Sequence, residues 1–284
     1  MSSVSQAHCV GCGAAVTGRY CDDCGEHTEP HDYSLAHLAT EVLETTAHLD
    51  GRVFGSFRSL VTSPGQLTTD FFAGRRKSRL GPVHLFVLCN VIYFLFLPLA
   101  LQLPFTSTLR MQTENRPWRA MATQMVDTKV AERHEPIEEY AARFDEAAHL
   151  QGHSLVMLMV PVFAIGVWAL HPRARRYYAE HLVFSFYAMG FLLLWMTVVT
   201  VPVSQIYRLG VHSGWWPPNG SLLEVILDAP IALGFIAYLA AASRRSYADG
   251  WPAAIGKAGS LVAWLAACLT IHRFILFFTT FYAT

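Results

Sequence analysis

Charged residues are scarce in this sequence: they make up 15% of its 284 positions, where a soluble domain usually has about a quarter. Basic and acidic side chains are equal in number, so the formal net charge is zero. Without a basic excess, the sequence lacks the electrostatic footprint of a nucleic-acid-binding protein, and no nucleic acid is expected as a partner. The first residues are polar and contain no apolar stretch of the kind found in signal peptides, so we expect no cleavable leader.

Familiar catalytic patterns are also missing. The sequence has no nucleophile elbow, no P-loop and no dinucleotide-binding glycine pattern, so nothing positive supports an enzyme. His149 and His153 have the spacing of a helical metal pair but lack the adjacent glutamate of the zincin pattern. His171 and His181 lie on either side of an arginine-rich loop. A second metal centre at these histidines is therefore the weaker interpretation, and we expect a protein that is not an enzyme.

What the sequence has instead is long apolar runs. The first, from Val83 to Leu103, has 21 residues and no charge. As a helix it would reach roughly 30 Å, which is the thickness of a bilayer's hydrocarbon core. The positive-inside rule places the N-terminal end of this run in the cytoplasm, because four cations lie directly before it: Arg75, Arg76, Lys77 and Arg79.

Four further apolar runs raise the expected number of membrane spans to five. The expected spans are residues 83–103, 153–170, 181–206, 222–242 and 259–281. The segments assigned to the cytoplasm carry further cations, namely Arg173, Arg175, Arg176, Arg244, Arg245 and Lys257. The long outer loop, 105–152, is net acidic, and within it residues 123–150 are expected to form an amphipathic helix split near Pro136. This layout leaves the N-terminus in the cytoplasm and the C-terminus in the periplasm.

Four of the six cysteines are paired near the N-terminus. Cys9 and Cys12, and then Cys21 and Cys24, form two Cys-x2-Cys-Gly knuckles, with eight residues between Cys12 and Cys21. Each knuckle can direct two thiolates at one centre, and four thiolates close the coordination shell of a structural zinc. We therefore predict one Zn²⁺ per chain in a zinc-ribbon-like head that the metal keeps folded. A redox dithiol in each half is the alternative.

Between this head and the first span, residues 33–81 carry three amphipathic segments. Their patterns predict helices at about 34–49, from Arg52 to a stop at Ser63-Pro64-Gly65, and at 66–72. These helices form either an interfacial collar at the inner leaflet or a small soluble hairpin. The expected fold class is an all-α polytopic membrane protein with a small N-terminal zinc-ribbon-like knuckle. Its expected domains are 1–32 for the head, 33–81 for the juxtamembrane helices and 82–284 for the membrane domain.

Several of these features occur together in a known family. They are the tandem Cys-x2-Cys-Gly head, Ser63-Pro64-Gly65, Phe72-Ala73-Gly74-Arg75-Arg76, and the Pro82-anchored span with Asn90 and Tyr93-Phe94. In these features residues 9–98 resemble an uncharacterised bacterial family, domain of unknown function 3667. The resemblance implies a bacterial integral membrane protein with a zinc-ribbon-like head, and it implies no reaction. We expect the protein in the bacterial inner membrane.

Polar side chains inside the expected spans are the remaining candidates for a site. His272 and Arg273 interrupt the fifth span, and Arg273 is expected in the outer half of the bilayer, where it can snorkel to the headgroups. If Arg273 faces the bundle instead, Glu224 and Asp228 are the acids nearest to it in depth. His272 and Asn90 could join such a site, although each is more often an interhelical hydrogen-bonding residue.

Two functions compete on these grounds. In the first, the zinc head recruits or senses a cytoplasmic protein partner, and the spans anchor the head to the lipid bilayer. In the second, a transporter or lipid-handling protein uses the polar site around Arg273. Five spans without a visible inverted repeat are unusual for a secondary transporter unless the chain forms an oligomer, so the first function is favoured.

Overall fold

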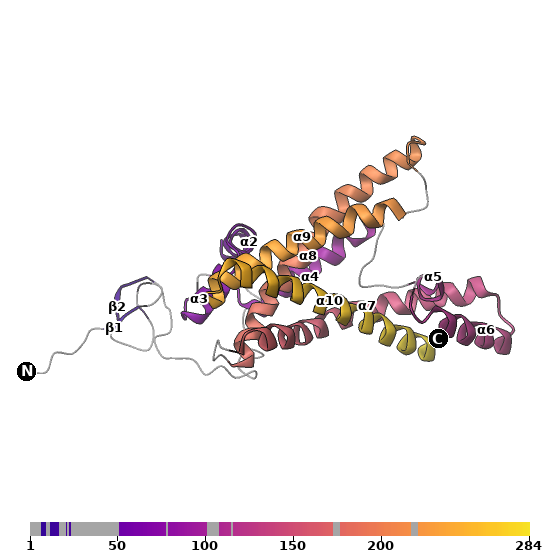
Figure 1. The fold of residues 1–284 in the computed structure, drawn as a ribbon, viewed down its shortest axis with the longest axis horizontal. Helices are drawn as coiled ribbons and strands as arrows, with labels where there is room; N and C mark the ends of the chain where they lie inside the picture. Colours follow the sequence, from indigo (N-terminus) through magenta and orange to yellow (C-terminus); the bar gives the residue numbers. More distant parts are fainter. Residues whose placement is uncertain are drawn as a thin grey trace, which may run out of the picture. The chain divides into compact units, whose positions relative to one another are not determined.

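The computed structural model consists mainly of helices (Figure 1). It describes residues 7–9, 12–16, 21, 23, 51–77, 79–100, 108–114, 116–172, 177–216 and 221–284. Within these ranges, the side chains of residues 149, 150, 152–156 and 221–225 are not described. The expected helix at about 34–49 and the expected ligand Cys24 lie outside the described residues.

A short hairpin of β1 (Ala7–His8) and β2 (Ala15–Val16) comes first in the chain. The helices that follow are α2 (Arg52–Thr62), α3 (Gln66–Phe72), α4 (Pro82–Phe96) with the 3-10 turn η1 (Leu97–Leu99), α5 (Leu109–Glu114), α6 (Arg119–Arg133), α7 (Ile137–Leu170), α8 (Tyr178–His212), α9 (Ser221–Tyr247) and α10 (Trp251–Ala283). The expected break near Pro136 is confirmed, since α6 ends at Arg133 and His134 takes a left-handed φ of 52°. The expected stop between α2 and α3 is also confirmed, and Gly65 there has a φ of 78°.

Residue contacts divide the chain into two compact units. Unit 1 comprises residues 1–100 and 164–262, and unit 2 comprises residues 101–163 and 263–284. The long helices α7 and α10 each contribute residues to both units. The expected domain boundaries after residues 32 and 81 stay predictions, because this division follows contacts between helices.

Four described helical segments are long and apolar enough to cross a membrane. They are Pro82–Leu99, Tyr178–His212, Ile226–Tyr247 and Trp251–Ala283. Segments of this length and hydropathy are those of a multi-pass membrane protein. The remaining expected span, 153–170, falls in α7, whose apolar part Met157–Leu170 is shorter than a usual span. The total of five spans stays a prediction.

In unit 1, α4 and α8 pack closely because small side chains meet where they cross. A Cβ added to Gly190 of α8 would lie 3.4 Å from the Sγ of Cys89 on α4. Cys89 is fully buried, as expected for a cysteine that serves as a small apolar packing residue. The rings of Phe86 and Phe186 meet edge to face with centroids 5.6 Å apart. Such close packing matters in lipid, where no hydrophobic effect drives helices together.

Helices α8 and α9 lie side by side (Figure 1), and one tryptophan of α8 makes close contact with α9. The indole of Trp195 lies so close to Gly234 that a Cβ there would come within 2.4 Å of the indole nitrogen. The same nitrogen donates a hydrogen bond to the Pro230 carbonyl at 3.2 Å. One turn earlier in α8, the rings of Phe191 and Tyr238 stack with centroids 3.7 Å apart. These contacts fix the register of the two helices.

The segment before α4 is attached to the end of α9. We call residues 51–81, which comprise α2, the turn 63–65, α3 and the loop 73–81, the collar. A Cβ added to Gly65 would lie 2.8 Å from the carbonyl oxygen of Ala242. Arg245 donates a hydrogen bond from Nη1 to the carbonyl of Pro64 at 3.3 Å. The collar therefore rests on the C-terminal turns of α9, next to the arginines that the positive-inside rule assigns to the cytoplasm.

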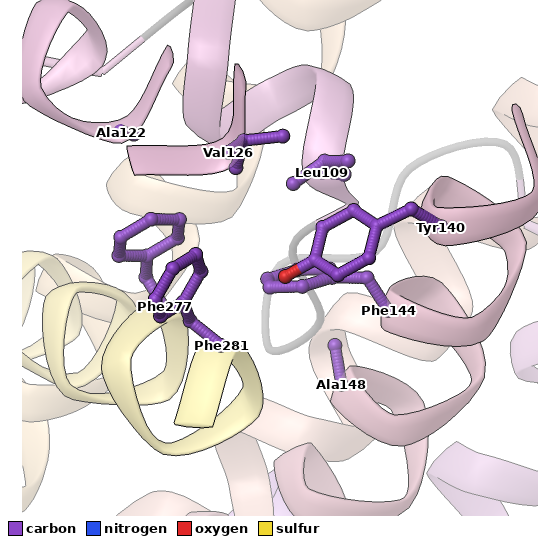
Figure 2. Packing of buried hydrophobic residues seen from close by; sticks show 8 residues of the cluster. All are labelled: Leu109, Ala122, Val126, Tyr140, Phe144, Ala148, Phe277 and Phe281. Carbon is purple, nitrogen blue, oxygen red and sulfur yellow. The ribbon is translucent and has the colours of Figure 1, made fainter. Parts of the chain in front are cut away.

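Unit 2 has an aromatic core of its own. Figure 2 shows its buried side chains, which come from α5, α6, α7 and α10: Leu109, Ala122, Val126, Tyr140, Phe144, Ala148, Phe277 and Phe281. The backbone of α10 is held as well, because the Gln112 amide donates to the Arg273 carbonyl at 3.1 Å. Gln112 in turn accepts a hydrogen bond from the Trp118 indole at 2.9 Å. The C-terminal turns of α10 thus pack against α5, α6 and α7.

Candidate functional site

The first candidate site is the turn between β1 and β2. The Cys9 amide donates to the Ala14 carbonyl at 2.8 Å, and the Gly13 amide donates to the Cys9 carbonyl at 2.9 Å. Gly13 has a φ of +80°, a conformation that glycine adopts without steric cost. The tight turn presents Cys9 and Cys12 together, as the Cys-x2-Cys-Gly spacing predicts.

Three thiols converge at this turn. The Sγ atoms of Cys9, Cys12 and Cys21 all lie within 4.8 Å of one another, so this group could hold a metal ion. The Cys12 and Cys21 sulfurs are 3.5 Å apart, far longer than the disulfide bond length of about 2.05 Å. Thiolates bound to one zinc at about 2.3 Å each stand roughly 3.8 Å from one another. The separations and the sulfur ligands therefore fit zinc, and the fourth ligand that we expect is Cys24.

A second polar group lies in unit 1, where four helices begin or end. We call it the polar network: His171, His181, Tyr247, Asp249 and Lys257. Asp249 accepts a hydrogen bond from the Lys257 ammonium at 2.6 Å, and its second oxygen lies 3.1 Å from Nε2 of His171. The Tyr247 hydroxyl lies 2.9 Å from Nδ1 of His181. The Tyr247 ring also stacks on the His171 ring, with centroids 4.0 Å apart.

Burial sets the electrostatics of this network. It lowers the pKa of His171 because an imidazolium loses its water there, and the charge of Lys257 lowers the pKa further. The Val167 carbonyl and Asp249 favour the charged form but do not outweigh burial. Nδ1 of His171 lies 2.8 Å from the Val167 carbonyl, a pure acceptor, so the N–H of the neutral ring is assigned to Nδ1. A hydrogen bond between Nε2 and Asp249 then needs a proton on one of the two, so the network can hold one exchangeable proton.

Reasoning from the sequence missed most of this network. It noted His171 and His181 on either side of a basic loop, but Asp249 lies 78 residues further along the chain than His171. The available signal was Asp249 itself, an acid in the short turn between two apolar helices. Among the residues that the structure describes, the cysteines are the one group placed to hold a metal, and the side chain of His149 is not described.

The residues predicted around Arg273 are divided between the two units. His272 and Arg273 lie on α10 in unit 2. His272 is 6% exposed, and neither of its ring nitrogens has a hydrogen-bond partner among the described residues. Arg273 is half-buried, and it follows Trp251, the first residue of α10, by a helix length of roughly 33 Å, close to the thickness of a bilayer's hydrocarbon core.

The other predicted members of that site lie in unit 1. Asn90 is half-buried on α4, and Asp228 is exposed on α9. Glu224 also lies on α9, where its side chain is not described. A pairing of these acids with Arg273 stays a prediction.

Comparison with known proteins supports the resemblance read from the sequence. No curated protein matches the chain, and no solved structure matches it. The model of one protein family, described as protein of unknown function DUF3667, matches residues 50–94. The match covers the collar and most of α4, and it leaves out the cysteine head. The segment from α2 through most of α4 is therefore the part of this helical, membrane-type chain by which the family DUF3667 is recognised.

Proposed function

We propose that this chain is a bacterial inner-membrane protein whose zinc-stabilised N-terminal head binds a cytoplasmic protein partner. The observation that carries the proposal is the convergence of the Cys9, Cys12 and Cys21 thiols within 4.8 Å. Together with Cys24, they would complete a shell of four thiolates, which leaves no coordination position open for a substrate. Such a site supplies folding energy to a small head, and a folded head in front of the membrane is suited to protein contact.

Contacts inside unit 1 support five spans for this protein. Near the polar network, α7 ends, α8 begins, α9 ends and α10 begins. The start of α4 lies on α8 as well, because the Tyr187 hydroxyl donates to the Leu80 carbonyl at 3.2 Å. If all these helix ends face the cytoplasm, α4 carries the chain across the membrane to the outer side. The chain must then cross the membrane a second time before α8 begins. Among the described segments between them, Met157–Leu170 is the apolar helix available for that crossing.

The alternative is a transporter or lipid-handling protein that works through Arg273. One observation favours it: His272 is buried, and its ring nitrogens have no hydrogen-bond partner among the described residues. Against it, the Arg273 carbonyl is bound by Gln112 of α5, a helix outside the expected spans. If Arg273→Leu abolishes the function in cells while Cys21→Ser only lowers the amount of protein, the alternative is correct.

Metal analysis tests the head directly. Detergent-purified chain is expected to contain about one zinc per chain, and the double variant Cys9→Ser, Cys12→Ser is expected to lose it. Cys89→Ser is the matched control, because Cys89 is buried between α4 and α8 and should leave the zinc content unchanged. Purified chain without zinc, with thiols that oxidise reversibly, would contradict the proposal.

Vesicles of opposite orientation test the topology. After chelation, a membrane-impermeant thiol reagent should label the head cysteines in inside-out vesicles and not in right-side-out vesicles. A reporter fused after Thr284 that is active only in the periplasm should be active if five spans are present. An inactive periplasmic reporter, with an active cytoplasmic one, would reduce the number of spans to four.

A further inference from the structure

The outer face of α2 combines apolar and basic side chains. Phe54 and Val61 are 76% and 53% exposed, and Arg58, which lies between them in the sequence, is exposed as well. With about 100° per residue, Val61 and Arg58 lie about 20° and 40° from Phe54, on either side of it. The opposite side of the helix, with Ser56 and Leu60, is buried. The exposed arc of α2 therefore changes from apolar to cationic, which is typical of a helix in a membrane interface.

The collar as a whole is basic. Residues 51–81 contain six cations and one acid, Asp70. Asp70 is paired with Arg75 at 2.5 Å, and none of the ion pairs between described residues includes Arg58. Basic segments next to a membrane span are attracted to the anionic lipids of the cytoplasmic leaflet. The collar is therefore complementary in charge to that lipid surface.

Contacts place α2 at the level where α4 begins. The Ser56 hydroxyl accepts a hydrogen bond from the Leu80 amide at 2.9 Å, and Arg79 donates from Nη1 to the Gly55 carbonyl at 2.7 Å. The candidate span Pro82–Leu99 begins two residues after Leu80. This span is about 27 Å long, close to the thickness of the hydrocarbon core, so its first residue must lie at the membrane boundary. The exposed face of α2 lies at the same boundary.

A tryptophan marks this boundary at another helix end of unit 1. Trp251, the first residue of α10, is 53% exposed, and the Arg244 guanidinium lies 4.1 Å from its ring centroid. Exposed tryptophans gather at membrane–water interfaces. The next residue, Arg245, donates a hydrogen bond to the Pro64 carbonyl of the collar at 3.3 Å. The interfacial tryptophan and the collar therefore belong to the same level of the membrane.

We propose that α2 anchors the chain to the membrane surface, with Phe54 and Val61 in the acyl region of the cytoplasmic leaflet and Arg58 on the phosphates of its anionic lipids. The guanidinium of arginine suits a phosphate because it donates several hydrogen bonds in one plane. The anchor is independent of the zinc head, so a failure of either proposal leaves the other standing. The choice of leaflet rests on the proposed topology, which the vesicle experiment tests separately.

Photocrosslinking identifies what lies against α2. Full-length chain with benzoylphenylalanine in place of Phe54 should form adducts with phospholipid when bacterial membranes are irradiated, as mass spectrometry will show. The same label in place of Val198, which is 64% exposed on α8 within a candidate span, is the reference for a position that faces lipid. The label in place of Glu132, which is exposed on α6, is the reference for a position that faces water.

Other adducts at position 54 would overturn the proposal. An adduct with a second copy of the chain, with another protein or with residues 34–49 of the same chain would show that protein covers this face. A label at position 54 that behaves like the one at position 132, while position 198 reacts with lipid, would favour the soluble hairpin.

Hydrogen–deuterium exchange in nanodiscs tests the role of Arg58. Exchange of α2 in the full-length chain should be slower in phosphatidylglycerol than in phosphatidylcholine. Arg58→Gln should lower the ratio of the two rates by about fivefold, the contribution of one cation near an anionic surface. Arg52→Gln is the matched control. Arg52 is half-buried and lies about 120° from Arg58 around the same helix, so its loss should leave the ratio nearly unchanged.

Two outcomes of this experiment would contradict a contact between Arg58 and lipid phosphate. Equal effects of Arg58→Gln and Arg52→Gln would show a general attraction to a basic helix. Equal exchange of the unchanged chain in the two lipids would show that anionic lipid is not recognised at all.

Discussion

Both units bury aromatic rings, but they differ in the other side chains that they bury and expose. Along α8, unit 1 turns Val198 and Leu209 outward, at 64% and 68% exposure, and buries the polar network at the helix ends. Unit 2 buries aromatic rings and exposes charges, such as the Arg110–Glu114 pair, whose side chains are 82% and 52% exposed. The outward apolar side chains of unit 1 are those expected of helices in lipid, whereas unit 2 exposes charges as proteins in water do, together with apolar side chains such as Ile271 and Ile275.

The difference shows that an apolar helical segment can either face lipid or be buried in a protein core. Residues 263–283 of α10 are as apolar as the rest of that helix, yet they belong to unit 2. Phe277 is fully buried against Phe144 of α7, with ring centroids 6.1 Å apart. Hydropathy reports that a side chain avoids water, and it does not distinguish lipid from an aromatic core.

The largest effect is expected from the core of unit 2. Phe144→Ala removes a fully buried ring and should cost about 3 to 5 kcal/mol of stability, since a cavity remains. Hydrogen–deuterium exchange should then rise in α5, α6 and the end of α10, and remain unchanged in α8 and α9. Phe54→Ala, at a 76% exposed ring, is the control. Faster exchange throughout the chain would show that the units do not open separately.

Asp249→Asn should have the next largest effect, this time in unit 1. It leaves the Lys257 ammonium and the buried His171 without their carboxylate partner, and breaking such a buried pair costs about 3 kcal/mol. Thermal unfolding in detergent should show the loss, with increased exchange at the start of α10. Glu114→Gln breaks a pair on the surface of unit 2 and should cost less than about 1 kcal/mol. Similar losses in the two variants would refute the contrast between buried and exposed pairs.

Gly65→Ala should detach the collar from α9 at a smaller cost. The left-handed backbone costs about 1 to 2 kcal/mol with a Cβ, and the clash with the Ala242 carbonyl adds to it. Gly214→Ala has the same left-handed cost, with a φ of +75° and no atom within 4 Å of the new Cβ. The difference between the two variants, measured by thermal unfolding, isolates the contact between collar and α9. If they are equally stable, that contact contributes nothing.

The smallest expected effect is a change of stability on acidification, which has opposite signs in the two units. The pKa of His171 is lowered by burial, so acidification below about 6.5 protonates the unfolded chain first and weakens unit 1. Burial raises the pKa of Asp145, which accepts a hydrogen bond from the Leu109 amide. Acidification toward about pH 4 therefore protonates folded unit 2 first and stabilises it. Exchange rates measured at several pH values, with His171→Gln and Asp145→Asn as non-titrating controls, should show the two trends separately.

Local patterns were readable from the sequence, and long-range contacts were not. The Cys-x2-Cys-Gly spacing predicted converging thiols, and Ser63-Pro64-Gly65 and Pro136 predicted helix ends, because turn chemistry acts over a few residues. The bond between His171 and Asp249 depends on two helix ends that meet only in the folded chain. The core of unit 2 was hidden for the same reason, since Phe277 and Phe281 looked like ordinary residues of a span.

The contact between Trp195 and Gly234 also limits which substitutions these two positions can accept during evolution. The indole occupies the space that any side chain at position 234 would need, so the two positions are not free to change independently. A relative with alanine or a larger residue at the position of Gly234 should carry a smaller side chain in place of Trp195, or a shifted α9. Aligned relatives should therefore show covariation between these two positions.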